Sequence, residues 1–373
     1  MLKRLYADNY KSLFNFEFQP AAVNLLVGRN GSGKTSLFEV LGGLQDLLVW
    51  DKEASAAFPT ETLSRTRKDS RQRFELEVQQ PNEGTFRYVL ELHHEREKQV
   101  TRIQQEKLEF EGLLLFESNE SGVTLYEGAL IPGALKPGLF FHYTSERSYI
   151  ATIEPGNSPR IAWFRQFLAN IWLLNLDVRS IGATSQRETP FLERNANNFA
   201  SWYRHTLQEQ PDAIAVANEN LRKVLPGFRT LKAMASGRAK VLTASFNWPG
   251  AGAYDLDFTE LSEGQRTLVV LYALLHASAK GASLVCFDEP DNFIELAELQ
   301  PWLVRLSEIS REAGNQLLII SHNPEVIDYL AADHAWIFSR PGGGPTRLKP
   351  LKIDLEEGLR ASDWLRGRYG EEE

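Results

Sequence analysis

Cysteine, long apolar runs and a leader-like start are almost missing from this sequence. Cys286 is the only cysteine among 373 residues, so no disulfide can form within the chain, which fits a reducing compartment. No apolar segment approaches the ~18–20 residues that would span a bilayer. The opening residues Met1-Leu2-Lys3-Arg4 lack the apolar stretch of a signal peptide. We therefore expect a cytoplasmic protein and no membrane partner.

An excess of basic residues is also missing. Lys and Arg number 41 against 49 Asp and Glu, and the resulting net charge of −8 differs from the basic footprint of a nucleic-acid-binding domain. Two interpretations stay open for one locally basic stretch: a solvated loop and strand edge, or a contact with a phosphate backbone or an acidic partner. Its basic residues are Arg65, Arg67, Lys68, Arg71 and Arg73.

Several catalytic and architectural patterns are absent as well. The sequence has no G-x-S-x-G elbow and no cysteine nucleophile motif. His93 and His94 have no partner cluster at metal-ligand spacing, so we interpret them as surface or strand residues. Neither internal repeats nor sustained heptads occur, so a long coiled-coil arm is not expected.

A glycine-rich loop is the first chemical signal that is present. Residues 28–35 match G-x-x-x-x-G-K-[ST], follow an apolar strand at 23–27 and precede a helical pattern at 36–49. In such a loop the backbone N–H groups and the N-terminus of the following helix bind phosphates. Lys34 is expected to bridge the β- and γ-phosphates of ATP, and the Thr35 hydroxyl to ligate Mg²⁺. The expected nucleotide-binding residues are Gly28, Asn30, Gly31, Ser32, Gly33, Lys34, Thr35 and Ser36.

A pair of carboxylates closes a later apolar strand at 284–287. Asp288 and Glu289 stand at its carboxyl end, the edge at which α/β sheets bind ligands. Asp288 is expected to hold Mg²⁺, and Glu289 to polarise the attacking water. The alternative is an ordinary turn at a solvated strand end.

The pentapeptide Leu261-Ser262-Glu263-Gly264-Gln265 opens a further helical pattern at 262–279. Ser262 is a natural N-cap and Gln265 stands at the capping-box position, so capping alone explains much of the pattern. It does not explain Gly264, because glycine in a helix costs up to ~1 kcal/mol relative to alanine. A phosphate that approaches the backbone closely would explain it.

In this order, the three motifs resemble the ABC-type ATPases of the SMC, RecF and OLD group, over about residues 1–50 and 255–345. The resemblance implies that Ser262, Glu263, Gly264 and Gln265 contact nucleotide held by a second subunit, so that a homodimer sandwiches two ATP. It implies a γ-phosphate-sensing switch role for His322, catalytic roles for Glu289, His322 and Lys34, and a D-loop at Asp291 and Asn292.

Two further features of that group are less well defined in this chain. The Asn9-Tyr10-Lys11-Ser12-Leu13 segment resembles the group's early strand turn, which would place Lys11 near the phosphates; an exposed lysine is the alternative. The Q-loop glutamine has no confirming context, and its candidates are Gln72, Gln79 and Gln80.

Periodicity sets the expected architecture. Alternating runs at 74–78 and 86–92 predict a β-hairpin in a largely antiparallel N-terminal lobe, and helices are expected at 161–176, 198–208 and 212–225. Helix and strand then alternate to residue 338, which favours a parallel sheet flanked by helices. The expected fold is α/β: a P-loop NTPase head with a mixed β N-terminal lobe (1–160), a helical insertion or lid (161–235) and a C-terminal ATPase lobe (236–373).

Three functions are compatible with these motifs. The leading one is an ATP-gated dimeric switch, the ATPase component of a two-part system such as defence against phage. The residues after His322 are too few for the TOPRIM nuclease of OLD proteins, so a separate effector protein is expected. A RecF-like ATPase that binds DNA in repair is the alternative. The β-rich and helical insertion argues against the third, the nucleotide-binding subunit of a membrane transporter.

Overall fold

The computed structural model describes residues 1–126, 137–154, 158–250, 252–278, 282–351 and 360–368. The chain divides into two compact units. Unit 1 takes the described residues of Met1–Ile171, His334–Lys352 and Leu365–Glu373, and unit 2 those of Trp172–Asp333 and Ile353–Trp364. The division at 160 and 235 expected from the sequence stays a prediction.

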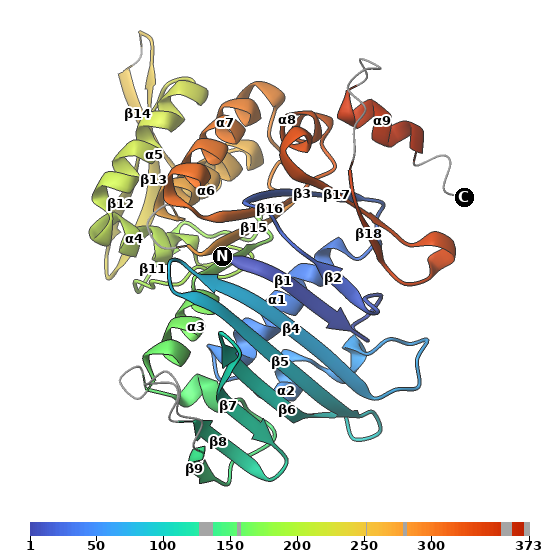
Figure 1. Ribbon diagram of the computed structural model, residues 1–373. Helices are drawn as coiled ribbons and strands as arrows, with labels where there is room; N and C mark the ends of the chain where they lie inside the picture. Colours follow the sequence, from blue (N-terminus) through green and yellow to red (C-terminus); the bar gives the residue numbers. More distant parts are fainter. Residues whose placement is uncertain (127–136, 155–157, 251, 279–281, 352–359, 369–373) are drawn as a thin grey trace. The chain divides into compact units, whose positions relative to one another are not determined.

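Unit 1 contains an antiparallel sheet of eight strands in the order β2-β1-β4-β5-β6-β7-β8-β9. Figure 1 shows β1, β4, β5 and β6 side by side. The hairpin of β4 and β5 turns at residues 81–83, as the sequence predicted. The strands are β1 (Leu2–Asp8), β2 (Phe16–Phe18), β4 (Arg71–Gln80), β5 (Gly84–Glu95), β6 (Val100–Phe110), β7 (Leu113–Asn119), β8 (Gly122–Tyr126) and β9 (Pro137–Phe141).

A second group of strands in unit 1 carries the glycine-rich loop. All residues of β3 (Val23–Gly28) are buried, and β3 pairs in parallel with β17 (Ala335–Ser339). β17 in turn pairs antiparallel with β18 (Arg347–Pro350). Helix α1 (Lys34–Leu48) begins directly after the loop and buries an apolar stripe at helical spacing. The loop is therefore fixed at both ends by buried structure.

Short helical segments pack against the large sheet of unit 1. The Phe58 ring stacks on Phe74 of β4 with ring centroids 4.7 Å apart, and Trp163 stacks on Phe86 of β5 at 5.3 Å. Such pairs add to the burial of apolar area. These segments are α2 (Ala54–Ala57), η1 (Thr60–Thr62), η3 (Tyr149–Thr152) and α3 (Pro159–Ala169). A further short segment, η5 (Pro341–Gly343), lies between β17 and β18.

Unit 2 combines a parallel strand pair with a helical layer and a small antiparallel sheet. β15 pairs in parallel with β16, β10 is the other neighbour of β15, and β13 pairs with β11, β12 and β14. Helix α6 contacts α5 and α7. The strands are β10 (Ile171–Leu174), β11 (Thr184–Ser185), β12 (Phe228–Ser236), β13 (Ala239–Trp248), β14 (Gly252–Asp257), β15 (Leu284–Asp288) and β16 (Gln316–Ile320).

The helices of unit 2 follow the predicted alternation closely. They are α4 (Phe199–Glu209), α5 (Pro211–Val224), η4 (Phe258–Glu260), α6 (Glu263–Ser278), α7 (Leu296–Ala313) and α8 (Pro324–His334). Helix α9 (Ala361–Arg368) is divided between the units. The predicted helix at 161–176 is wrong in its second half, because α3 ends at Ala169 and residues 171–174 form β10.

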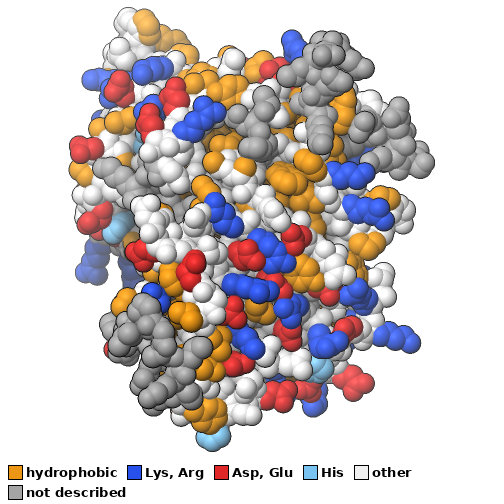
Figure 2. All heavy atoms as spheres, viewed as in Figure 1, with side chains coloured by type: hydrophobic (Ala, Val, Ile, Leu, Met, Phe, Trp, Pro, Cys, Tyr) orange, Lys and Arg blue, Asp and Glu red, His pale blue; other side chains and the backbone are white. Residues whose placement is uncertain are grey.

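Basic side chains on the large sheet of unit 1 are neutralised by neighbouring carboxylates. Arg73 contacts Glu75 and Glu91, and Arg4 contacts Glu75 at 2.8 Å. Figure 2 shows Lys and Arg side chains intermixed with Asp and Glu on this face. In the locally basic stretch, Arg67 pairs with Asp8 and Arg71 with Asp69. Three of the five basic residues of the stretch, Arg67, Arg71 and Arg73, are therefore charge-paired, and a contact of the stretch with a phosphate backbone stays a prediction.

Within the ranges that the structure describes, no helix is long and apolar enough to cross a bilayer.

Candidate functional site

The glycine-rich loop of unit 1 joins the buried strand β3 to helix α1. Gly28 adopts a φ of 153°, and a Cβ there would lie 2.3 Å from the carbonyl oxygen of Phe338 on β17, so only glycine fits. The buried Lys34 Nζ donates to the carbonyl oxygens of Gly28 and Arg29 at 2.7 and 3.1 Å. The lysine ammonium is thus held inside the curve of the loop, where it can meet an anion.

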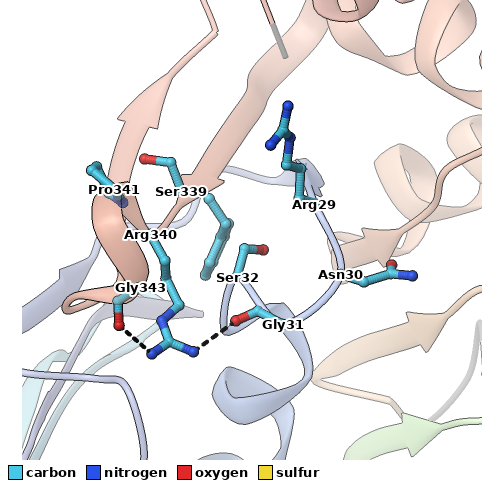
Figure 3. A pocket seen from close by; sticks show the side chains of 9 residues that line it. Arg29, Asn30, Gly31, Ser32, Ser339, Arg340, Pro341 and Gly343 are labelled. Carbon is cyan, nitrogen blue, oxygen red and sulfur yellow. Dashed lines mark hydrogen bonds between the residues drawn. The ribbon is translucent and has the colours of Figure 1, made fainter. Parts of the chain in front are cut away.

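A pocket of about 280 Å³ lies beside the first half of this loop. Figure 3 shows Ser32 and Arg340 on facing sides of it, with the Arg340 guanidinium directed at the carbonyl oxygen of Gly31. The Ser32 hydroxyl is buried and has no hydrogen-bond partner within the described residues. Asn30, which the sequence assigns to nucleotide binding, is exposed at the pocket rim.

Lys11 lies on the turn between β1 and β2, in the left-handed region with a φ of 50°. Its Nζ pairs with Glu39 Oε2 of α1 at 2.5 Å, and its side chain is 41% exposed. Glu39 lies on α1 a little beyond Thr35 and Ser36, so the pair connects the turn to the helix that follows the loop. A contact between Lys11 and phosphate stays a prediction.

The predicted Asp288 and Glu289 stand at the carboxyl end of β15 in unit 2. Glu289 adopts a φ of 50°, which residues other than glycine rarely do, and its N–H donates to the carbonyl oxygen of Ile320 on β16. The predicted His322 follows β16, and its Nε2 lies 3.7 Å from Glu289 Oε1. Both side chains are about two-fifths exposed. The two parallel strands therefore bring a carboxylate and an imidazole together at one open edge.

The D-loop residues Asp291 and Asn292 differ in their surroundings. Asn292 is exposed, and its Nδ2 donates to Glu289 Oε2 at 3.2 Å. Asp291 is largely buried; burial raises the pKa of its carboxyl, against hydrogen bonds from Ser321 and Asn323 that lower it. Asp291 thus links the β15 turn to the β16 turn, while Asn292 orients the Glu289 carboxylate.

One site residue was missed in the sequence. Asn175 directly follows β10, and its Nδ2 lies 3.4 Å from Asp288 Oδ2. The sequence reading had placed this segment inside a helix, which hid the position. The short, bulky run Ile-Trp-Leu-Leu at 171–174 was the signal for a strand that could have revealed it.

The pentapeptide at the start of α6 forms the predicted capping box. Ser262 Oγ accepts from the Gln265 N–H at 3.2 Å, and Gln265 Oε1 accepts from the Ser262 N–H at 3.1 Å. The exposed Ser262 hydroxyl therefore keeps its own proton for an outside acceptor. Capping and anion binding are compatible at this residue.

Gly264 has a structural reason that the sequence analysis did not foresee. A Cβ there would lie 2.5 Å from the carbonyl oxygen of Phe293, which itself has a φ of 72°. Glycine thus permits the close contact between α6 and the turn after β15. An approaching phosphate is not needed to explain it.

Glu263 forms an ion pair at the start of α6. Arg179 Nε and Nη2 donate to its two carboxylate oxygens at 2.7 and 3.1 Å, which lowers the pKa of Glu263. The Arg179 guanidinium also lies 5.1 Å from the Phe293 ring centre. The last four residues of the pentapeptide border a pocket of about 520 Å³ together with Phe293, Glu295 and Glu298. This pocket is open and rich in carboxylates.

Gln72, a candidate for the Q-loop, is buried away from any open edge. Its Nε2 donates to the Asn9 carbonyl oxygen at 3.0 Å, and its Oε1 faces His94 Nε2 at 2.9 Å. Burial lowers the pKa of His94 to about 4, so the ring is neutral near pH 7. His93 is exposed, and both histidines lie on β5. Gln72 therefore serves the interior of unit 1.

The oxygens expected to hold Mg²⁺ are the Thr35 hydroxyl in unit 1 and the Asp288 carboxylate in unit 2. Hard oxygens of this kind suit Mg²⁺, which binds to proteins through few ligands and keeps several waters. A dedicated protein cage is not seen: the described residues contain no cluster of three or more His, Cys, Asp or Glu placed to hold a metal.

Comparison with known proteins places these motifs in context. A family model described as "AAA domain, putative AbiEii toxin, Type IV TA system" matches residues 23–328. Among solved structures, an SMC head bound to the C-winged helix domain of ScpA is 14% identical with a TM-score of 0.60, covering 96% of this chain and 99% of that one.

A second solved structure supports the same fold. It is an Smc head domain with an extended coiled coil, bound to the C-terminal domain of ScpA derived from Pyrococcus furiosus; it is 13% identical with a TM-score of 0.53, covering 98% and 99% of the two chains. No curated protein matches the sequence. Identities this low show a shared fold only, and the predicted α/β fold of an SMC-like ATPase head is confirmed.

Proposed function

The chain belongs to the AAA family that its residues 23–328 match, and from this premise we propose that it is an ATPase that hydrolyses ATP as a homodimer and controls a separate effector protein. The observation that carries the proposal is the strand-end arrangement in unit 2, where Glu289 lies 3.7 Å from His322 and 3.2 Å from Asn292. A structural strand end has no need of a left-handed glutamate held by a histidine and an amide.

In the proposed mechanism, each of the site residues has a separate role. The backbone N–H groups of Gly31 and of residues 33–35, together with the Lys34 ammonium, bind the β- and γ-phosphates. Glu289 orients the attacking water and accepts its proton, and His322 holds the γ-phosphate in line. Thr35 and Asp288 would hold Mg²⁺, which would supply charge neutralisation at the phosphates.

The homodimer completes each site in this proposal. Ser262 offers its hydroxyl proton, and Gly264 and Gln265 offer the open helix start, to the γ-phosphate bound by the other copy. Asp291 and Asn292 would lie at the same interface. The exposed Ser262 and the open pocket that it lines with Glu263, Gly264 and Gln265 support this arrangement, because a second copy could reach them there.

A partner protein is proposed on two grounds. The description of the family names a putative toxin of a toxin–antitoxin system, and such a system has two components. In the two solved SMC heads of the same fold, the head is bound to a domain of ScpA. Phage defence is one biological setting for such a pair. The RecF-like alternative, DNA binding, has less support, because Arg67 and Arg71 of the locally basic stretch pair with carboxylates.

Glu289→Gln tests the proposal directly. The variant should bind ATP as the wild type does but hydrolyse it ~100-fold or more slowly, so that an ATP-dependent dimer accumulates in light scattering. Glu312→Gln, an exposed carboxylate at the end of α7, is the matched control and should behave as the wild type. A Glu289→Gln protein that stays monomeric at saturating ATP and micromolar concentration would contradict the dimer. Undiminished hydrolysis would contradict the role of Glu289.

A further inference from the structure

We propose that Arg340 and Thr346, on the segment between β17 and β18, are positioning residues that hold the phosphate loop in its binding conformation. The inference rests on the proposed ATP binding and adds a role for residues outside the loop. Neither residue belongs to a nucleotide-binding motif, and each donates a hydrogen bond to a backbone carbonyl oxygen of the loop.

Thr346 and Arg340 together form a brace for the loop, and Thr346 contributes a chain of hydroxyl groups to it. Its Oγ1 donates to the carbonyl oxygen of Ser32 at 2.9 Å, and it lies 2.8 Å from Ser12 Oγ, which must then be the donor of that second bond. The Thr346 N–H donates to the Ser12 carbonyl oxygen at 2.8 Å. Ser12, Ser32 and Thr346 are all buried. A directed chain of hydroxyl groups thus ends on the loop backbone.

Arg340 forms the other half of the brace. Its Nη1 donates to the carbonyl oxygen of Gly31 at 3.2 Å and its Nη2 to that of Gly343 at 2.8 Å (Figure 3). Its Nε donates to the carbonyl oxygen of Gly344, also at 2.8 Å. One guanidinium therefore ties the loop to the glycine-rich segment that follows β17. No carboxylate pairs with Arg340 among the described residues, so its hydrogen bonds go to backbone carbonyl groups.

These contacts bear on phosphate binding through peptide geometry. A trans peptide is planar, so fixing the carbonyl oxygen of one residue fixes the N–H of the next in the opposite direction. Thr346, through the Ser32 carbonyl, directs the Gly33 N–H to the inner side of the loop. Arg340, through the Gly31 carbonyl, fixes the plane of the Ser32 N–H, which donates to Arg29 and closes the turn. The loop is preorganised, and preorganisation raises affinity by lowering the ordering cost of binding.

Substitutions at the two positions separate this role from general stability. Arg340→Ala and Thr346→Val should each weaken MgATP binding and raise KM by ~10-fold, with kcat at saturation changed less than ~3-fold. Thr346→Ser keeps the hydroxyl and should bind within ~2-fold of the wild type, and Arg340→Lys should fall between. Arg347→Ala, an exposed arginine on β18, is the matched control and should leave both constants unchanged.

Binding is measured by calorimetric titration with MgATP, and the melting temperature without nucleotide is recorded for every variant. Arg340→Ala and Thr346→Val binding within ~2-fold of the wild type would overturn the brace and leave the ATPase proposal intact. A wild-type chain that does not bind MgATP would overturn the proposed function instead. If Thr346→Val has a lower melting temperature than the wild type, the test uses Thr346→Ser and Ser12→Ala instead. Ser12→Ala should weaken MgATP binding only while Thr346 is present, and a double-mutant cycle measures this dependence.

Discussion

The side chain of Asn175 lies against the carboxylate of Asp288, with Nδ2 and Oδ2 3.4 Å apart. Asn175 directly follows β10, which neighbours β15, so two adjacent strand ends bring an amide to the acidic group expected to hold Mg²⁺. An amide that donates to a metal-binding carboxylate fixes its orientation. Asn175 is therefore expected to orient the Asp288 carboxylate.

Asn175→Ala tests whether this contact matters for the metal. We expect the Mg²⁺ concentration for half-maximal ATP hydrolysis to rise ~10-fold or more, because the Asp288 carboxylate loses a group that orients it. Asn247→Ala, an exposed side chain on β13, is the control and should leave the Mg²⁺ titration unchanged. An Asn175→Ala protein with the wild-type Mg²⁺ requirement would limit Asn175 to a local structural role.

Gly264→Ala separates the two explanations of the glycine in the pentapeptide. The added Cβ would meet the Phe293 carbonyl oxygen at 2.5 Å, so the turn after β15 must move. We expect the free energy of unfolding to fall by about 1–3 kcal/mol even without nucleotide, as measured in urea. Gly182→Ala, which has open space around it and an ordinary φ, should be nearly neutral. Wild-type stability combined with loss of ATP-dependent dimerisation would favour the close approach of a phosphate instead.

Local signals in the sequence were sufficient for the motif-bearing elements. The β3–loop–α1 segment, the strand before Asp288 and the strand before His322 all lie where periodicity and glycine spacing placed them. The capping box of Ser262 and Gln265 also has the predicted hydrogen bonds. Each of these features depends on residues within a few positions of one another, which is the range over which sequence patterns are informative.

Features that depend on distant residues were not predictable. The contact of Gly264 with Phe293 joins a helix start to a turn 29 residues later, and nothing in the glycine spacing indicates it. Thr346 reaches Ser12 across 334 positions. The end of α3 and the start of β10 are separated by one residue, so the strongly apolar stretch 161–176 concealed a change from helix to strand. Tertiary packing decided these three cases.

Ser262→Arg tests the dimeric site through complementation. The arginine should block the approach of the other copy's nucleotide at the exposed start of α6, abolishing hydrolysis while each monomer still binds ATP. Mixing it with Glu289→Gln should restore about a quarter of the wild-type rate, because half of randomly paired dimers are mixed and each has one intact site. The mixture is assayed by phosphate release. No activity above the sum of the two separate proteins would contradict a site completed by a second copy.

Glu106 on β6 should make the free energy of unfolding depend on pH. Its side chain is fully buried, Tyr88 and Ser148 donate to Oε1 at 2.9 and 2.6 Å, and Oε2 has no partner within the described residues. Burial raises the pKa of the Glu106 carboxyl to about 7, against the two hydrogen bonds that lower it. The native state therefore holds a proton that the unfolded chain releases above about pH 4.5.

The direction in which stability changes with pH follows from this proton. Glu106 contributes its full stability below about pH 4.5, and loses it as pH rises to about 7. Glu106→Gln stays neutral, so the free energy of unfolding of the wild type minus that of the variant should fall by about 2–3 kcal/mol from pH 5 to pH 8. Urea unfolding at several pH values measures it. His94 and His276, neutral in the fold with pKa values near 4, affect both proteins equally. Glu120→Gln, exposed in the β7–β8 turn, is the control, and a difference that does not change with pH would show that Glu106 is ionised in the native state.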